Sequence, residues 1–272
     1  MPGRKPRGWC QGAGRPPMAD VTSLYMRLRE RARQIVSRLP PPDFYRDENA
    51  AVSLSESLFE STPLVVDVRQ SVVALLEDDF GHGWLHARKV AVDAGALMHV
   101  EGRAAGYSRE FLRRRTCLAH CAGLLHDIRR KRPEHAEQGA ACARGLMSGQ
   151  AFSPAEIEDI CIAIRNHEAF KTALSVNTRD GALLSDCLYD ADKFRWGPDN
   201  FSDTLWAMAA FVRPPLSEFL RRYPSGMERL ARIKTSFRTA TGAKYGPQFI
   251  DLGIAIGEEL YRVITAEFAS ES

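Results

Sequence analysis

The stretch CLAHCAGLLHDIRRKRPEHAEQGA, residues 117–140, decides the fold. It begins with the strongly apolar run CLAHCAGLL, which predicts a helix of the core. His126 and Asp127 follow directly. Because neighbouring residues on a helix point about 100° apart, these two side chains can face one ion only where the helix ends or distorts. The charged, proline-containing segment that comes next predicts such an end.

Helical patterns continue on both sides of this stretch. Gly, Pro, Ser or Asp bounds each of them; in SPAE, residues 153–156, Ser can cap a helix, Pro suits its first turn and Glu favours its positive end. The predicted helices are residues 20–39, 63–77, 83–101, 109–125, 133–148, 154–166, 180–193, 202–212, 215–223, 227–240 and 247–268. No convincing strand alternation or internal repeat is present, so the sequence predicts an all-α fold.

The chain divides into four parts. Residues 1–19 are basic and rich in Gly and Pro, which indicates a disordered tail, with Met18 as an alternative start. Residues 20–62 form an N-terminal helix, stopped by Pro40-Pro41-Pro42, and a linker. Residues 63–200 form the core of the domain, and the helices of residues 201–272 are expected to pack on that same domain.

Composition excludes several classes of protein. The 272 residues include 37 basic and 34 acidic ones, and a net charge of +3 gives no bulk reason to expect nucleic-acid binding. The six cysteines show no CxxC spacing and most lie in apolar helical patterns, which favours a reducing cytoplasm. No run of eighteen apolar residues exists, so no membrane span is expected. A homo-oligomer is compatible with the sequence.

Histidine and aspartate side chains gather at the ends of apolar helical patterns. His86 lies near the start of one pattern, His126 and Asp127 end another, and Asp190 and Asp192 end a third. Imidazole nitrogens with carboxylate oxygens suit Mn, Fe, Co, Ni or Zn better than Mg alone. The sequence therefore suggests a site for a divalent transition metal.

The order His86, His126-Asp127, Asp192 resembles the H…HD…D signature of the HD-domain superfamily of metal-dependent phosphohydrolases. The flanking segments agree: HGWLHARKVAVDAGALMHVEG and LAHCAGLLHDI resemble the first two motif helices of small bacterial HD hydrolases, and YDADKF resembles the segment with the last aspartate. The resemblance covers roughly residues 80–195. It implies a single HD-domain helical bundle, extended by the N-terminal helix and the C-terminal helices.

The resemblance implies the metal ligands His86, His126, Asp127 and Asp192. Asp192 is preferred to Asp190 because the family aspartate directly precedes a basic residue, but Asp190 remains an alternative. In HD proteins with two metals, further histidines complete the second site, and PEHAEQGA and IRNHEAF resemble the segments that carry them. These segments hold His135 and His167, which bind either a second metal or substrate phosphate. His82 is interpreted as a capping or substrate-side residue, and His99 and His120 as surface and core.

Basic residues beside the motifs are candidates for binding phosphate, because Arg presents a fork that matches phosphate oxygens. Arg129 and Arg130 follow the His-Asp pair, and Arg165 and Lys193 each adjoin a motif residue. A solvated turn is the alternative for the run of residues 129–132. The segment FRWGPDNF, residues 194–201, departs from the pattern of the small hydrolases, so the substrate stays open.

The function implied is hydrolysis of a nucleotide or other small phosphate ester by metal-activated water. Asp127 would orient the water or accept its proton, with Arg129, His135 and His167 as further catalytic candidates. Arg130, Arg165 and Lys193 would bind substrate. The alternatives are an HD-fold di-iron oxygenase and a non-catalytic HD-type binding or regulatory module.

Overall fold

The computed structural model describes residues 18–76 and 81–268, and within these ranges it consists of helices, turns and loops without a strand. The α-helices are α1 (Met18–Val36), α2 (Asp43–Asp47), α3 (Asn49–Ser61), α4 (Pro63–Val73), α5 (Trp84–Ala104), α6 (Arg109–Leu125), α7 (His135–Met147), α8 (Pro154–Asn166), α9 (Arg179–Phe194), α10 (Leu205–Val212), α11 (Leu216–Ile233) and α12 (Ala240–Glu267). A π-helical segment, η2 (Asn200–Thr204), precedes α10. The predicted all-α fold is confirmed.

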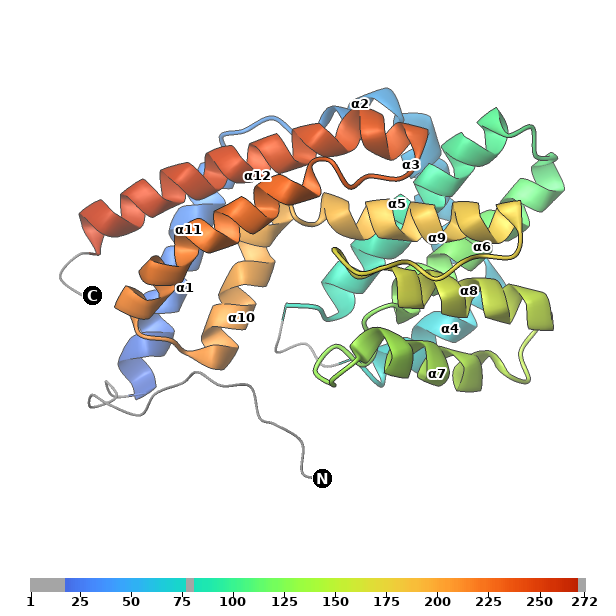
Figure 1. Ribbon diagram of the computed structural model, residues 1–272, viewed down its shortest axis with the longest axis horizontal. Helices are drawn as coiled ribbons and strands as arrows, with labels where there is room; N and C mark the ends of the chain where they lie inside the picture. Colours follow the sequence, from blue (N-terminus) through green and yellow to red (C-terminus); the bar gives the residue numbers. More distant parts are fainter. Residues whose placement is uncertain (1–17, 77–80, 269–272) are drawn as a thin grey trace.

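The helices form two groups that α12 joins. Helices α3 to α9 pack together on one side, and α1, α10 and α11 pack together on the other (Figure 1). Helix α12 runs along both groups, so that Phe249 belongs to the buried core of the first and Leu260 to that of the second. We call these the bundle core and the wall core. The site described below lies where the two groups meet.

Small residues let α5 and α6 approach closely at the centre of the bundle core. A Cβ added at Gly123 would lie 2.4 Å from the Cα of Ala91, and one added at Gly95 would lie 2.2 Å from the ring of His120. His120 is fully buried, as expected, and its ring bonds to the Ser55 hydroxyl at 2.8 Å. Close packing of α5 on α6 brings His86 opposite the end of α6.

Capping side chains start several of these helices. Ser108 Oγ accepts a hydrogen bond from the Phe111 N–H at the start of α6. At the start of α8, the predicted cap is present in full: Ser153 Oγ accepts from the Glu156 N–H, and the Glu156 carboxylate accepts from the Ser153 N–H. Helix α6 ends at Leu125, so the predicted end before the His-Asp pair is also confirmed.

Three predicted boundaries differ from the structure. The expected linker contains α2 and α3, whose Phe44 and Phe59 are fully buried in the bundle core. This segment is therefore a packed part of the bundle and not a linker. The predicted break near Tyr223 is absent, because α11 continues through Pro224 while its apolar face packs on α12. Helix α12 begins at Ala240, before Pro247, because Thr239 caps it through the Gly242 N–H at 2.8 Å.

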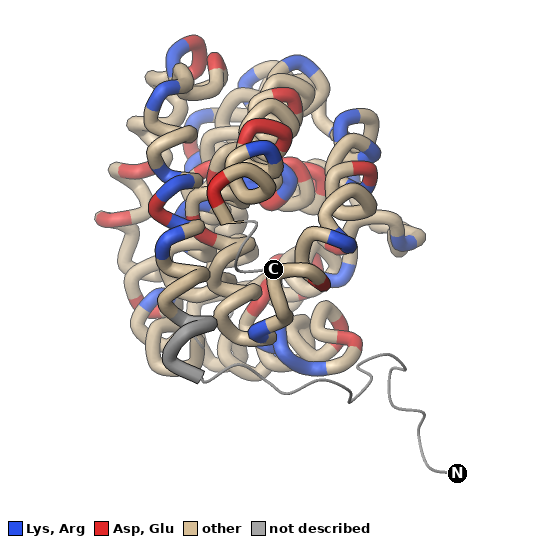
Figure 2. The backbone as a smooth tube through the Cα atoms, turned by 90° about the vertical axis from the view of Figure 1, so that its left-hand side faces the viewer, with Lys and Arg blue, Asp and Glu red and all other residues tan. Residues whose placement is uncertain are grey.

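Surface features agree with the composition. Basic and acidic residues are interspersed along the described helices (Figure 2). None of the helices within residues 18–76 and 81–268 is both long and apolar enough to cross a membrane. Cys117, Cys121, Cys161 and Cys187 are buried free thiols, as the apolar patterns around them indicate. The expected disordered tail falls mainly on residues 1–17, which lie outside the described residues.

Candidate metal centre

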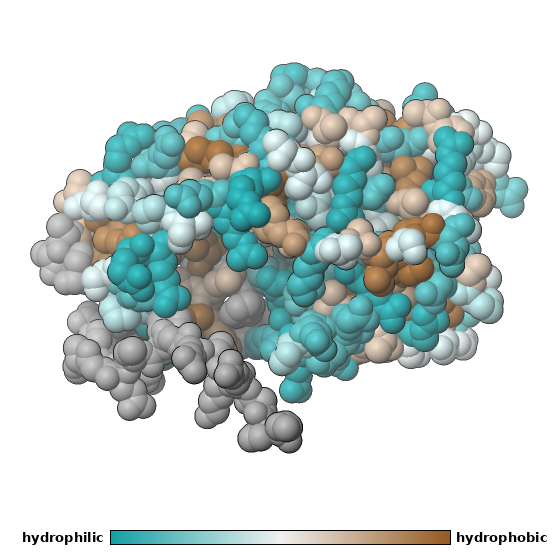
Figure 3. Space-filling view, in the orientation of Figure 1, coloured by the Kyte–Doolittle hydropathy of each residue, from teal (hydrophilic) through white to brown (hydrophobic). Residues whose placement is uncertain are grey.

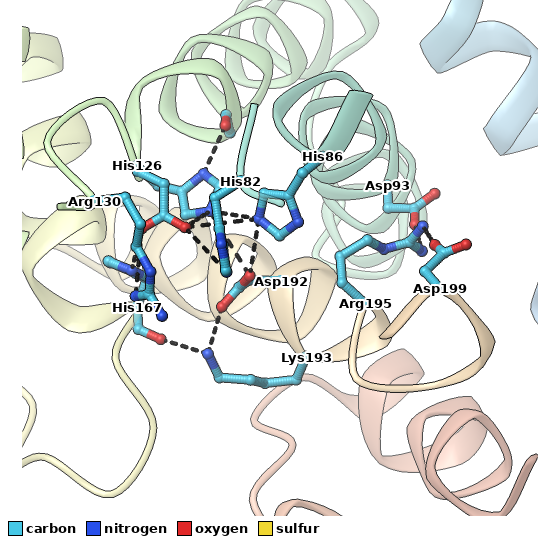
Figure 4. A network of polar contacts seen from close by, with 12 residues as sticks. His82, His86, Asp93, His126, Arg130, His167, Asp192, Lys193, Arg195 and Asp199 are labelled. Atoms are coloured by element: carbon cyan, nitrogen blue, oxygen red, sulfur yellow. Dashed lines mark hydrogen bonds and ion pairs between the residues drawn. The ribbon is translucent and has the colours of Figure 1, made fainter. Parts of the chain in front are cut away.

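Four side chains from three separate segments of the sequence converge at the junction of α5, α6 and α9 (Figure 4). The Nε2 atoms of His86 and His126 lie 3.1 Å apart. Asp127 Oδ2 lies 3.4 Å from His126 Nε2, and Asp192 Oδ1 lies 3.5 Å from His86 Nε2. All four residues are buried. The structure therefore brings together the four residues predicted as metal ligands.

Backbone carbonyls orient two of the imidazole rings. His126 Nδ1 bonds to the Gly123 carbonyl at 2.8 Å, and His167 Nδ1 bonds to the Ile164 carbonyl at 2.6 Å. In each ring Nδ1 donates its proton outward, which leaves the lone pair of Nε2 facing the cluster. This is the arrangement by which histidine ligands of metals are usually held.

The Asp127 carboxylate has one oxygen that fits a bound cation. Its Oδ1 atom is buried and makes no hydrogen bond with any described residue. It lies 3.5 Å from His135 Nε2 and 3.4 Å from His167 Nε2. A buried carboxylate oxygen without a hydrogen bond is costly, and a metal ion would satisfy it. Donor atoms close enough to share an ion occur in three overlapping groups: His82, His86 and Asp127; His86, His126 and Asp192; and His126, Asp127 and His167.

The two aspartates of α9 have different surroundings. Burial alone would raise the pKa of Asp192, but the Lys193 ammonium and His86 hold that pKa well below its usual range. Asp190 instead accepts hydrogen bonds from the N–H groups of Arg238 and Thr239, at 2.9 and 2.8 Å, just before α12. Burial raises the pKa of Asp190 to about 6. Asp192 therefore lies in the cluster, and Asp190 fixes the start of α12.

His135 and Arg130 border the cluster on the side of the turn that follows α6. Burial lowers the pKa of His135 to about 4, so the ring is neutral at pH 7. Its Nε2 accepts a hydrogen bond from Arg130 Nη1 at 2.9 Å and lies 3.4 Å from His167 Nε2. Arg130 Nη1 also lies 3.7 Å from Asp127 Oδ1. The guanidinium of Arg130 thus lies beside the Asp127 carboxylate.

The other predicted basic residues lie in three different settings. Lys193 is buried and donates to the His167 carbonyl at 2.8 Å and to Asp192. Arg129 lines a small cavity of about 40 Å³ beside Asp127. Arg165 is not brought to the cluster, because it pairs with Glu137 of α7 at 2.8 Å. A substrate-binding role for Arg165 has no support in this geometry.

Sequence reasoning missed a second buried polar network next to the cluster. Arg195, just after α9, donates to Asp93 of α5 and to Asp199 (Figure 4). It also donates to the hydroxyl of Tyr45 at 2.6 Å. Asp199 also accepts from Lys89 at 2.7 Å. The signal in the sequence was the single aspartate within the apolar run VAVDAGALM. This network ties the end of α9, which carries Asp192, to α5, which carries His86.

A cavity of about 550 Å³ opens from the cluster toward α10 and α11. His82, His86, Asp127, Arg130, His167 and Asp192 line its inner end. His82 Nε2 lies 4.0 Å from Asp127 Oδ2, which agrees with its interpretation as a substrate-side residue. In Figure 3, apolar side chains are recessed left of the centre of this face, between the two groups of helices. The cluster therefore has room beside it for a bound molecule.

Comparison with protein-family models, with curated proteins and with solved structures finds no significant match for this chain.

Proposed function

We propose that this chain is a metal-dependent phosphohydrolase of the HD type that acts on small phosphate esters. The observation that carries the proposal is the convergence of His86, His126, Asp127 and Asp192 on one point, with the buried Oδ1 of Asp127 left without a hydrogen bond. Mixed imidazole and carboxylate donors favour Mn, Fe, Co, Ni or Zn. The order of these residues along the chain agrees with the H…HD…D signature.

The side chains in and around the cluster have different roles in the proposed reaction. When bound, a divalent ion supplies Lewis acidity, which makes water a better nucleophile near neutral pH and withdraws charge from a phosphoryl oxygen. Arg130 binds a second phosphoryl oxygen, because its guanidinium lies at the cluster and is only partly buried. Asp127 orients the attacking water or accepts its proton. Lys193 keeps the Asp192 carboxylate ionised and directed inward.

His135 and His167 either bind a second ion or make a further contact to the phosphate. Their Nε2 atoms face Asp127 Oδ1 at 3.5 and 3.4 Å, and His126, Asp127 and His167 form one of the possible donor groups. A two-metal site would clamp both the attacking and the leaving oxygen of the phosphate. The number of ions per chain decides between these roles, and His135→Ala separates them: it lowers a content of two ions to one, or leaves a content of one unchanged.

Metal content and hydrolysis test the proposal together. Purified protein is analysed for metals by elemental emission and assayed with Mn²⁺, Co²⁺, Ni²⁺ and Mg²⁺ against nucleotides and simple phosphate esters. His126→Ala and Asp127→Ala should lose the metal and at least about a thousandfold in kcat/KM. His99→Ala is the matched control, because His99 lies on α5 about 20 Å along the helix from His86. Unchanged activity in both cluster variants would overturn the proposal.

A di-iron oxygenase is the second candidate, because six donor residues besides His82 meet in the cluster. These are His86, His126, Asp127, His135, His167 and Asp192. Two tightly bound irons per chain, together with oxygen consumption, would favour this function over hydrolysis.

A further inference from the structure

The cavity beside the cluster has a polar end and an apolar end. The polar end is the histidine and aspartate cluster with Arg130. The apolar end is formed by α10 and α11 and includes Leu205, Met208, Val212, Phe219, Met227 and Leu230. A volume of about 550 Å³ exceeds what a phosphate group alone would fill. The molecule that fits this cavity therefore carries a second, larger part.

Polar atoms of the apolar end are occupied by contacts within the protein. The hydroxyl of Tyr223 donates to the Gly257 carbonyl at 2.9 Å, so this side chain presents the ring to the cavity. The carbonyl of Pro214, another lining residue, accepts from the Tyr25 hydroxyl at 2.7 Å. Because these groups are satisfied, the wall offers mainly hydrocarbon to a ligand.

The composition of α10 also indicates that an apolar ligand covers this part of the wall. Its sequence LWAMAAFV contains no charged residue, yet Phe211 and Val212 at its end are 51% and 45% exposed. Helices that are apolar all round are normally buried. Val212 lines the cavity, so an apolar ligand there would remove its exposed surface from water.

A nucleobase would need several hydrogen-bonding partners in the same place. Asn200 and Thr204 of η2, with Trp196 and Tyr223, are the uncharged side chains with polar atoms among the residues that line this end of the cavity, and Arg222 and Arg229 are charged. Arg222 donates to Glu218, and Arg229 lies over the ring of Phe170. A site specific for a polar base relies on buried polar groups that pair with it, which this wall has few of.

We infer that the preferred substrates are phosphate esters of an apolar alcohol, with the phosphate at the cluster and the hydrocarbon part against α10 and α11. The position of the phosphate rests on the proposed function, whereas the preference for hydrocarbon rests on the apolar side chains of α10 and α11 that line the cavity. The cleaved bond is the ester link to phosphorus: water adds to phosphorus, and the alcohol leaves with a proton.

Binding of alkylphosphonates, which are not hydrolysed, tests the inference without relying on catalysis. Ethylphosphonate, octylphosphonate and the phosphonate analogue of adenosine 5′-monophosphate, which has no ester bond to phosphorus, are titrated by calorimetry into the Mn²⁺-loaded protein, below the micelle concentration of the octyl compound. Each buried methylene strengthens binding by up to about fourfold, so octylphosphonate should bind at least about 30-fold more tightly than ethylphosphonate. Ethyl and octyl compounds that bind within about twofold of each other, or tighter binding of the nucleotide analogue than of the octyl compound, would overturn it.

A pair of glycine variants locates the hydrocarbon. Gly226 of α11 lines the cavity, and a Cβ added there meets no atom of the described residues within 4 Å. Gly226→Phe should lower the preference for octylphosphonate over ethylphosphonate at least about tenfold. Gly145 of α7 is also an exposed helical glycine with the same free space, but it does not line the cavity. Gly145→Phe should leave the preference unchanged; an equal preference in both variants would count against the assigned position.

Hydrolysis assays separate this inference from the function on which it rests. If no phosphate ester is hydrolysed with any metal but octylphosphonate keeps its advantage in binding, the proposed function fails and the cavity assignment stands. If esters are hydrolysed but neither binding nor kcat/KM rises from butyl phosphate to octyl phosphate, the inference fails and the proposed function stands.

Discussion

The bundle core and the wall core differ most where each borders the site. At Gly123, α6 packs against the backbone of α5, Gly95 leaves room for the His120 ring, and the ends of these helices hold the histidine and aspartate cluster. The wall core instead contains large rings such as Tyr25, Trp206 and Phe219, packed at tilted or edge-on angles beside the cavity. Small residues allow close helix contacts beside the cluster, whereas large rings supply apolar surface beside the cavity. The polar cluster and the apolar wall of the cavity thus lie in different groups of helices.

The largest effect is expected where the two halves meet. Arg195→Ala should lower the free energy of unfolding by about 4 kcal/mol, because it leaves the buried Asp93 without its cationic partner. Urea denaturation followed by circular dichroism measures this loss. The double variant Arg195→Met with Asp93→Leu removes both charges and should be more stable than Arg195→Ala alone. If the single and double variants lose equal stability, the ion pair does not account for the effect.

A glycine pair tests the close packing of the bundle core. Gly123→Ala should cost about 3 kcal/mol, since the new Cβ would lie 2.4 Å from the Ala91 backbone, which cannot move without shifting α5. Gly145→Ala is the control and should add about 0.5 to 1 kcal/mol, because alanine is the better helix former at an open position. Similar melting temperatures for the two variants would show that α5 and α6 are not held as tightly as described.

Metal binding should stabilise the protein only through the ligand residues of the bundle, and not through the wall. At a free Mn²⁺ concentration of about 100 times Kd, the free energy of unfolding should rise by about 2.7 kcal/mol. We expect the same increment in Gly226→Phe, which alters only the wall, and none in His126→Ala. Thermal unfolding at matched Mn²⁺ concentrations gives the comparison. A reduced increment in Gly226→Phe would mean that the wall takes part in holding the ion.

The smallest effect concerns the start of α8, far from the wall. The hydrogen bond from Arg114 lowers the pKa of Glu156 to about 2, below its ordinary value of 4.5. Ionised Glu156 therefore contributes stability above pH 4.5, and this contribution is lost as the pH falls through about 2. Solvent screening limits it to about 0.5 kcal/mol, so Glu156→Gln should be less stable by that amount at pH 7 and equal to the wild type at pH 2. A constant difference across this range would contradict the assignment.

The sequence predicted the helices and the cluster because both are marked locally. Apolar spacing marks a helix. The His-Asp pair alone is a weak signal, but it becomes specific together with the segments around His86 and Asp192. Arg165 misled the prediction, since proximity to His167 in sequence does not place its side chain on the same side of α8. Arg195 was missed for the opposite reason: its partner Asp93 lies 102 residues away, and only the fold brings them together. Whether α2 and α3 are helical likewise depends on burial of Phe44 and Phe59 in a core contributed by later segments.

Helix α12 also has a consequence for the order in which the molecule is assembled. It leaves the ribosome after every other described helix, yet Phe249 completes the bundle core, and Leu260 and Ile264 complete the wall core. Its N-terminal end is anchored by Thr239, which bonds to Asp190 two residues before Asp192. During synthesis, therefore, neither core is fully covered until α12 emerges. The nascent chain therefore exposes apolar surface, and is prone to aggregate, up to that point.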